Sequence, residues 1–438
     1  MFPANSPSVS FSDLLRAFTR IGFLSFGGPA GQIALMHREL VEERRWVGEE
    51  DFLHALNFCH LLPGPEAQQL ATWIGWRIHG WRGGLAAGLL FVIPGACIIL
   101  VLSMLYALAA NLDWVAALFL GVKAAVLAIV VQALVRIAGR SLDTWLKRAL
   151  ALGAFAGLFL FSWPFPLIVL GAGAIGAAFA SRRPDLLALK PGRMADALSA
   201  RPWRATIVAV LVWGVVWAAP MILIAATLGR GHVLWEIGAF FSQLAIVTFG
   251  GAYAVLAYMA QEAVQGFGWL RPGEMADGLG LAETTPGPLI LVTQFVGYLA
   301  AFRAPEPFSP LVAGLLGAGL TTWVTFAPCF LWIFALAPWI DRLGQTIWLK
   351  GGLSAVTAAV VGVIANLTAW FALHVLFARV GELQVGLLRL SWPDPVSFDW
   401  QAGVLALLAF VLAFGAKWSV LRLLGVSALG GLVLGLAI

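Results

Sequence analysis

Long apolar stretches, broken by short segments rich in polar residues, Gly and Pro, make up most of this 438-residue chain. An apolar run of about 17–25 residues is long enough to cross a bilayer as a helix. The pattern therefore predicts an all-α integral membrane protein, a polytopic helical bundle. The apolar stretches are Gly83–Ala110, Trp114–Ala138, Leu146–Trp163, Phe165–Ala180, Ala205–Leu228, Leu311–Trp339, Leu353–Leu376, Trp400–Ala416 and Trp418–Ile438.

Two of the polar segments are copies of each other. Ser25-Phe26-Gly27-Gly28, Trp46 and Pro63-Gly64-Pro65 recur, 223 residues later and without a gap, as Thr248-Phe249-Gly250-Gly251, Trp269 and Pro286-Gly287-Pro288, and 12 of the 41 aligned positions are identical. Beyond the motif the offset becomes 234, so that Pro94 matches Pro328 and Lys123 matches Thr357. The predicted organisation is a first repeat over 1–180, a basic linker over 181–204, an extra transmembrane helix over 205–235 and a second repeat over 236–438.

The two repeats are expected to have opposite orientations. Five long apolar runs lie between the two broken segments. If each broken segment is re-entrant, or otherwise enters and leaves on one side, five crossings invert the second copy. The Arg- and Lys-rich linker is expected in the cytoplasm by the positive-inside rule. Duplicated units interrupted by Gly and Pro, inside a very apolar chain, indicate the binding site of a transporter.

The Pro-Gly-Pro motifs are predicted to begin helices. Proline suits the first turn of a helix, where its missing N–H costs nothing. We expect Pro65 to open a helix over Glu66–Arg77 and Pro288 to open one that reaches Val296 or beyond. Two helix N-termini aimed at one place would form an anion site from backbone N–H groups and helix dipoles.

Several side chains could assist such a site. Ser25, Thr248, Gln69 and Gln294 are neutral hydrogen-bonding groups, and Arg38 or Lys123 could supply a cation. Glu66, Glu283 and His60 could carry protons, although each also has a structural interpretation as a dipole partner or a hydrogen-bonding strut. The full predicted substrate site is Ser25, Phe26, Gly27, Gly28, Arg38, Pro63, Gly64, Pro65, Glu66, Gln69, Lys123, Thr248, Gly250, Gly251, Glu283, Pro286, Gly287, Pro288 and Gln294.

Composition supports the membrane assignment. The chain is 61% hydrophobic and 11% charged, with a mean hydropathy of +0.90, whereas a soluble domain is roughly 25% charged. The net charge of +5 reflects Lys and Arg in loops and does not indicate nucleic-acid binding. The sequence holds no nucleophile–base or metal-ligand pattern, so we expect a protein that is not an enzyme and has no cofactor or metal.

The stretches Ile21–Pro29 and Pro63–Ala71, with Trp46 and Pro94, resemble the first half of the chromate ion transporter family. Ala282–Pro288 and Gln294–Gly297 resemble that family's second half. The likeness runs from about Phe11 to the C-terminus and is to the long, two-domain type. Ala252 stands where the first copy has Pro29, so the two halves are not equivalent.

This resemblance implies export of chromate across the bacterial inner membrane by a multi-pass protein, giving chromate resistance, with antiparallel halves. It implies chromate as the partner, and sulfate stays open because the two ions match in charge and shape. A passive anion channel and, more remotely, an intramembrane enzyme also stay open. The apolar outer faces fit lipid or a second copy of the chain, so a homodimer is open as well.

Overall fold

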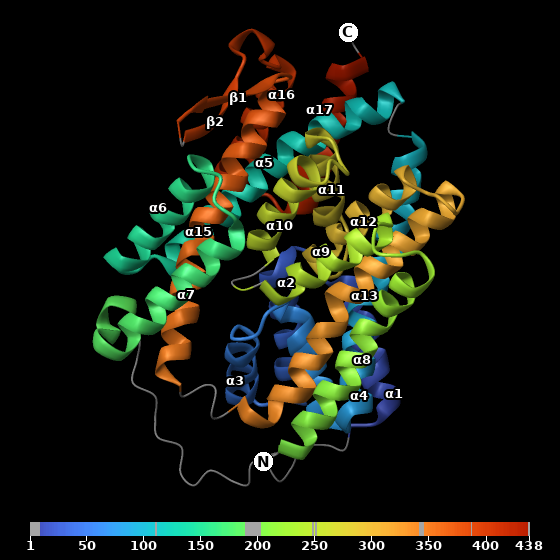
Figure 1. Ribbon diagram of the computed structural model, residues 1–438, viewed down its shortest axis with the longest axis vertical. Helices are drawn as coiled ribbons and strands as arrows, with labels where there is room; N and C mark the ends of the chain where they lie inside the picture. Colours follow the sequence, from blue (N-terminus) through green and yellow to red (C-terminus); the bar gives the residue numbers. More distant parts are fainter. Residues whose placement is uncertain are drawn as a thin grey trace. The chain divides into compact units, whose positions relative to one another are not determined.

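The computed structural model describes residues 9–109, 112–188, 203–247, 249, 252–340, 346–386 and 388–436. The protein is mostly helical (Figure 1). Among these residues, six helices are long and apolar enough to span a bilayer. This confirms a polytopic helical membrane protein. The six are Glu66–Ala109, Asp113–Ser141, Phe165–Arg182, Trp203–Thr227, Pro310–Trp339 and Ile347–Leu376.

The chain divides into two compact units. The first unit comprises Met1–Leu102, Gly192–Ala252 and Thr285–Thr346, and the second comprises Ser103–Pro191, Tyr253–Thr284 and Ile347–Ile438. Each unit therefore takes segments from both halves of the sequence.

The first unit holds both Pro-Gly-Pro motifs. Its helices before the second half are α1 (Phe11–Leu24), α2 (Gly28–His37), η1 (Arg38–Glu43), α3 (Glu49–Cys59), most of α4 (Glu66–Ala109) and α8 (Trp203–Thr227). The later ones are α9 (Val233–Val247), η4 (Leu289–Leu291), α12 (Val292–Arg303), α13 (Pro310–Leu336) and η5 (Ala337–Trp339). Helix α13 packs against α8, α9 and α12.

Helix α4 is two helices joined at a break. Gly80 has φ +60° and ψ −152°, a conformation outside the helical region, and His79 before it is also non-helical. Only glycine adopts such a backbone readily, because the Cβ atom of any other residue would clash with its own backbone. The first piece is the short helix that Pro65 opens, and the second is the long apolar span that contains Pro94.

The second unit is built around two long helices, α5 (Asp113–Ser141) and α15 (Ile347–Leu376). Helix α15 packs against α6 and α7 (Figure 1), and α5 packs against α16 and α17. The shorter elements are α6 (Trp145–Phe159), α7 (Phe165–Arg182), η2 (Pro184–Leu187), α10 (Ala252–Gln261), η3 (Glu262–Gly266), α11 (Pro272–Thr284), η6 (Pro395–Ser397), α16 (Trp400–Phe410), η7 (Val411–Gly415) and α17 (Val420–Leu436).

Glycines bring the helices of the second unit together in the same way twice. Gly176 of α7 lies against the backbone carbonyl of Gly351 on α15, and Gly431 of α17 lies against the carbonyl of Ala117 on α5. A side chain at either glycine would overlap that carbonyl, as expected where small residues let membrane helices approach closely. Ala117 and Gly351 are separated by the same 234 positions that relate the two sequence copies.

The expectation of an all-α protein is wrong in one detail. Strands β1 (Val380–Val385) and β2 (Leu388–Pro393) form a two-stranded antiparallel sheet directly after α15. This hairpin follows the last apolar residues of the span and its strands carry Glu382, Gln384 and Arg389. A two-stranded hairpin is marginal alone and needs packing against other elements, so local sequence patterns did not reveal it.

Helix α8 has a nearly continuous apolar surface that the protein leaves uncovered. None of the apolar window that marks it as a span is buried within the structure. Ile207, Leu211 and Leu223 are each more than half exposed. A helix that is hydrophobic all round is stable when lipid or protein surrounds it, so α8 fits a position facing lipid.

Candidate functional site

Both Pro-Gly-Pro motifs are buried loops that lead into helices. Gly64 has φ +115° and Gly287 has φ +90°, values that favour glycine over residues with a side chain. Helix α4 begins at Glu66, and η4 at Leu289 continues into α12, so both predicted helix starts are confirmed. The first N–H groups of such helices have no partner within the helix and are free to bind an external acceptor.

The first Phe-Gly-Gly segment holds the second Pro-Gly-Pro motif. The backbone N–H of Gly287 donates to the carbonyl of Ser25 at 2.9 Å, and Gln32 Nε2 donates to the carbonyl of Gly287 at 2.6 Å. Ser25 and Gln32 are both buried. Ser25 and Gly287, which are 262 positions apart in the chain, are thus joined by a backbone hydrogen bond. Gln32 is a candidate site residue that was not predicted from the sequence.

Each Pro-Gly-Pro motif also packs against the long helix of the other sequence half. A methyl group on Gly64 would lie 2.9 Å from Cys329 Sγ, and one on Gly287 would lie 3.4 Å from the Cα atom of Gly95. Gly95 and Cys329 are the residues after the matched prolines Pro94 and Pro328. The two contacts are therefore equivalent under the sequence alignment, and both lie in the first unit.

The side-chain amides near the motifs brace the backbone. Gln69 Nε2 donates to the carbonyl of Pro63 at 2.6 Å, and Gln294 Nε2 donates to the carbonyl of Ala96 at 3.0 Å. Ser25 Oγ donates to the carbonyl of Ile21 at 2.6 Å. The Ser25 hydroxyl and one N–H of each glutamine amide are thus already engaged with backbone carbonyls, so in the proposed site the backbone N–H groups at the helix starts are the main donors for a ligand.

The same amides leave buried acceptors without partners. Among the described residues, Gln69 Oε1 and Gln294 Oε1 are buried and find no hydrogen-bond partner, and the same holds for Gln68 Oε1 and Thr325 Oγ1. A buried polar atom without a partner is costly, and native proteins rarely keep one without a reason. These oxygens are acceptors that a ligand proton or a water molecule would satisfy.

The predicted cation Arg38 lies away from the motifs. It is exposed on η1, and its Nε atom is 3.7 Å from Glu43 Oε1. One position further on, Glu39 is buried between Arg20 and Arg44, at 3.4 and 3.6 Å. This buried carboxylate is balanced by two arginines, so the charged part of η1 acts to hold α1 and η1 together.

The second predicted cation, Lys123, belongs to the second unit and has a carboxylate partner. Its Nζ atom is 3.2 Å from Asp277 Oδ1, and Tyr106 OH donates to Asp277 Oδ2 at 2.7 Å. Asp277 is 5% exposed. The absence of a C-β at Gly273 leaves room for Lys123 Nζ beside α11. Sequence reasoning missed Asp277 because it lies 154 residues from Lys123 in the chain.

The predicted proton carriers lie in different surroundings. Glu66 is half-buried in the first turn of α4, where its negative charge interacts favourably with the positive end of the helix dipole. Glu283 is buried near the end of α11 in the second unit, and His60 is exposed after α3. Thr248, Gly250 and Gly251 lie outside the described residues.

A search of known families decides the class of the protein. The chromate transporter family model matches residues 12–177 and 235–435. The chain belongs to this family. The two matched regions include both Pro-Gly-Pro motifs and leave out the whole of the linker and of α8.

Individual relatives agree with the family match. The chain is 32% identical to a chromate transport protein of Pseudomonas aeruginosa over 429 residues, which cover 94% of this chain and 93% of the relative. It is 29% identical to a probable chromate transport protein of Synechococcus elongatus over 82% of this chain and 84% of that one. An uncharacterized transporter of Methanocaldococcus jannaschii is 24% identical over 85% and 86%. No solved structure matches the chain.

The conformation of Gly64 generates the first prediction. Gly64→Ala should lower the free energy of unfolding by roughly 1–3 kcal/mol, because the methyl group meets both an unfavourable φ and the Cys329 and Gln69 side chains. Thermal unfolding of the purified protein in detergent measures the effect. Gly229→Ala is the matched control, because Gly229 has φ +82° and no neighbour for the added methyl group. Equal losses for the two variants would contradict the packing argument.

The Lys123–Asp277 pair generates the second prediction. Lys123→Met should cost roughly 3–5 kcal/mol of stability, because it leaves Asp277 buried without its cation. The double variant Lys123→Met with Asp277→Asn should recover most of that loss, since the neutral amide still accepts from Tyr106. A double-mutant cycle by thermal unfolding measures the coupling, and strictly additive losses would show that the pair is not coupled. Transport by the double variant then separates a structural lysine from one that attracts the substrate.

Proposed function

We propose that the protein is a secondary transporter that exports chromate, a tetrahedral oxyanion, from the cytoplasm across the bacterial inner membrane and so confers chromate resistance. The observation that carries the proposal is the pair of buried Pro-Gly-Pro motifs in the first unit, each opening a helix. The names of the relatives, which are transport proteins, support transport rather than an enzymatic reaction.

The substrate site in this proposal is made mainly of backbone. The helix starts after Pro65 and Pro288 supply N–H groups and positive dipole ends to the oxyanion. Ser25, Gln32 and Gln69 hold these loops in place, and Gln294 ties α12 to α4. We assign no cation to the site, since Arg38 and Lys123 each lie beside a carboxylate.

Two inverted repeats, 1–180 and 236–438, are part of the proposal. The cross-packing of Gly64 with Cys329 and of Gly287 with Gly95 supports it. So do the equivalent glycine contacts of α7 and α17 in the second unit. In this arrangement the Pro-Gly-Pro motif of each half packs against a long helix of the other half. Such a symmetric arrangement would let the substrate site open to one side of the membrane and then to the other.

The membrane potential is a sufficient driving force. With the inside negative, each negative charge that leaves gains about 2.3 kcal/mol per 100 mV, so a dianion gains about 4.6 kcal/mol. ATP is therefore not required.

Uptake of labelled chromate into inverted membrane vesicles tests the proposal. Uptake should rise when a potential is imposed and fall when it is collapsed, and it should saturate well below the rates of a channel. Excess unlabelled sulfate should compete if the site recognises only shape and charge. Vesicles that take up no chromate under any gradient, beside an active control transporter, would overturn the export function.

Proton coupling would be an addition to this mechanism. If Glu66, Glu283 or His60 carries the proton, the triple variant Glu66→Gln, Glu283→Gln and His60→Asn should keep potential-driven export and lose its dependence on external pH. Rates measured in the same vesicles over a pH series report this. An unchanged pH profile in the triple variant would remove these three residues from the mechanism.

A further inference from the structure

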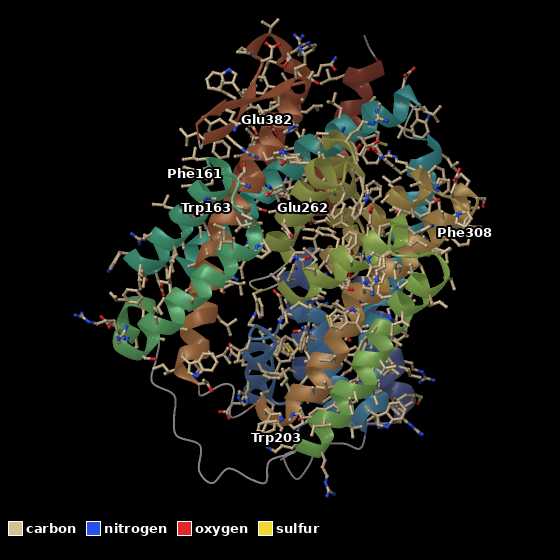
Figure 2. The ribbon with its side chains drawn as sticks, in the orientation of Figure 1. Phe161, Trp163, Trp203, Glu262, Phe308 and Glu382 are labelled. Carbon is tan, nitrogen blue, oxygen red and sulfur yellow. The ribbon has the colours of Figure 1, made fainter. Side chains whose placement is uncertain are left out.

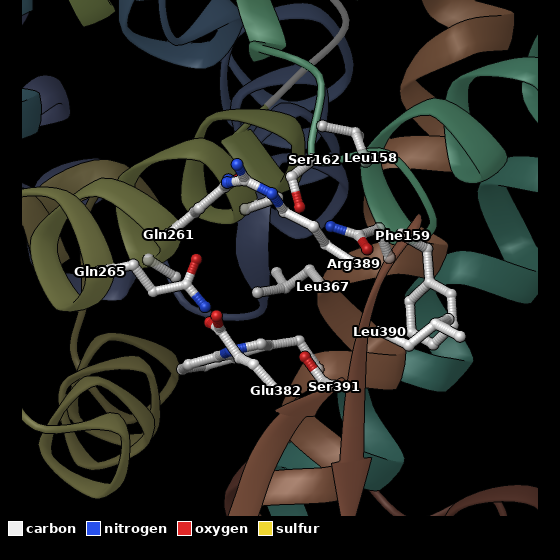
Figure 3. A pocket seen from close by; sticks show the side chains of 14 residues that line it. Leu158, Phe159, Ser162, Gln261, Gln265, Leu367, Glu382, Arg389, Leu390 and Ser391 are labelled. Atoms are coloured by element: carbon white, nitrogen blue, oxygen red, sulfur yellow. The ribbon is translucent and has the colours of Figure 1, made fainter. Parts of the chain in front are cut away.

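The second unit contains a cavity that plays no part in the proposed transport site. Its volume is about 290 Å³. The β-hairpin, the end of α6, the α10–η3 segment and the last turns of α15 line it, and it is open to the outside (Figure 3). The backbone N–H of Arg389 donates to the carbonyl of Leu160 at 2.8 Å and fixes the hairpin against the α6–α7 turn. This bond fixes the position of one wall of the cavity.

The polar side chains around the cavity have no partners within the described parts of the chain. Seven of them line it and make no hydrogen bond or ion pair with another described side chain: Ser162, Gln261, Gln265, Asn366, Glu382, Arg389 and Ser391. Ser162, Gln265, Glu382 and Arg389 are exposed, and Gln261, Asn366 and Ser391 are partly buried, so all seven can reach a ligand that enters from outside. A group of seven that converge on one space is a set of contacts suited to a polar ligand.

The strand register explains why the charges meet there. Glu382 pairs with Ser391, and Arg389 pairs with Gln384. Because side chains alternate along a strand, these four share one face of the hairpin. Glu382 and Arg389 are diagonal neighbours on that face, about 7–8 Å apart, yet they do not form an ion pair. Figure 3 shows the two side chains entering the cavity separately, with Gln265 beside Glu382.

This separation of charge selects the class of ligand. A guanidinium binds phosphate with strong, directional hydrogen bonds, which suits Arg389. An ammonium group suits Glu382 together with the indole ring of Trp370, another lining residue. A small dianion alone would be attracted by Arg389 and repelled by Glu382. A zwitterion with a phosphate and an ammonium group satisfies both charges.

The position of the cavity points to a lipid as the source of that zwitterion. Asn366, Leu367 and Trp370 belong to the last turns of α15, a membrane-spanning helix that ends at Leu376. Phe161 and Trp163 lie stacked and exposed on the adjacent α6–α7 turn (Figure 2). Exposed aromatic residues are enriched at the level of the phospholipid headgroups. We propose that this cavity binds the headgroup of an ethanolamine phospholipid, with its phosphate at Arg389 and its ammonium group at Glu382.

Lipid exchange on the wild-type protein is the first test. The purified full-length protein is stripped of lipid in detergent and titrated with phosphatidylethanolamine, phosphatidylglycerol or soluble phosphoethanolamine, and binding is counted by native mass spectrometry. We expect one tight site for phosphatidylethanolamine. Phosphatidylglycerol has the phosphate without the ammonium group and should bind at least about tenfold more weakly, the loss of one charged hydrogen bond. Equal binding of the two lipids would overturn the proposal.

Variants locate the site. Arg389→Gln and Glu382→Gln should each weaken phosphatidylethanolamine binding about tenfold or more, while Arg389→Lys should keep part of the affinity. Arg379→Gln is the matched control, because Arg379 lies at the base of the same hairpin, pairs with Asp394 at 2.8 Å and does not line the cavity. Thermal unfolding verifies that every variant compared is folded. Loss of the lipid in Arg379→Gln but not in Arg389→Gln would overturn the proposal.

Two further outcomes distinguish other ligands. Phosphoethanolamine that binds as tightly as the lipid would assign the cavity to a soluble zwitterion and refute the lipid. Sulfate or chromate that displaces the lipid from wild type, and itself fails to bind Arg389→Gln, would show an oxyanion site and refute the zwitterion.

Discussion

The structure depends on satisfying backbone groups where helices are interrupted in an apolar protein. Away from water, each unpaired N–H or C=O group costs several kcal/mol, so irregular backbone persists only where the protein supplies partners. The carbonyl of Pro63 accepts a hydrogen bond from the side-chain amide of Gln69, and that of Gly287 accepts one from Gln32. The carbonyl of Ala96 accepts one from Gln294. The N–H of Gly287 finds the carbonyl of Ser25. Glutamine is therefore the characteristic residue of this interior, because one neutral side chain satisfies a carbonyl without bringing a charge.

Close backbone approach is the second requirement, and glycine meets it. Gly95 lies against the carbonyl of Pro286, and a side chain there would displace the motif. Pro94, one residue earlier, removes a helix hydrogen bond and frees the carbonyl of Leu90. Gly22 of α1 packs directly on that carbonyl. Gly95, Pro94 and Gly22 thus mark places where two backbones lie in contact.

The sequence predicts much of this fold because the signals are local. Every long apolar run coincides with a helix or a helix pair, and the helices after Pro65 and Pro288 begin where proline favours a first turn. The hairpin at Glu382–Arg389 was missed because its strands depend on packing against the α6–α7 turn. Asp277 was missed as the partner of Lys123, and Gln69 was assigned to the ligand although its amide binds the carbonyl of Pro63. Neither of these two contacts can be read from the sequence pattern. The assignment of segments from both halves to one unit depends on the same long-range contacts.

In the proposed site, the arrangement of donors and acceptors would also bear on which oxyanion fits best. Helix N-termini supply donors that distinguish little between tetrahedral dianions, since chromate and sulfate share charge and shape. The buried oxygens of Gln68, Gln69 and Gln294, which have no hydrogen-bond partner in the described part of the chain, would add acceptors to that site. Their orientation is defined for Gln69 and Gln294, because the nitrogen of each amide donates to a carbonyl and the oxygen must point elsewhere. An acceptor favours a ligand that carries a proton. Hydrogenchromate is a much weaker acid than hydrogensulfate. Chromate therefore keeps a proton more readily than sulfate near neutral pH. A site with backbone donors and amide acceptors would then discriminate by protonation where it cannot discriminate by shape, and a hydrogenchromate monoanion would gain about 2.3 kcal/mol per 100 mV on export, half the gain of the dianion.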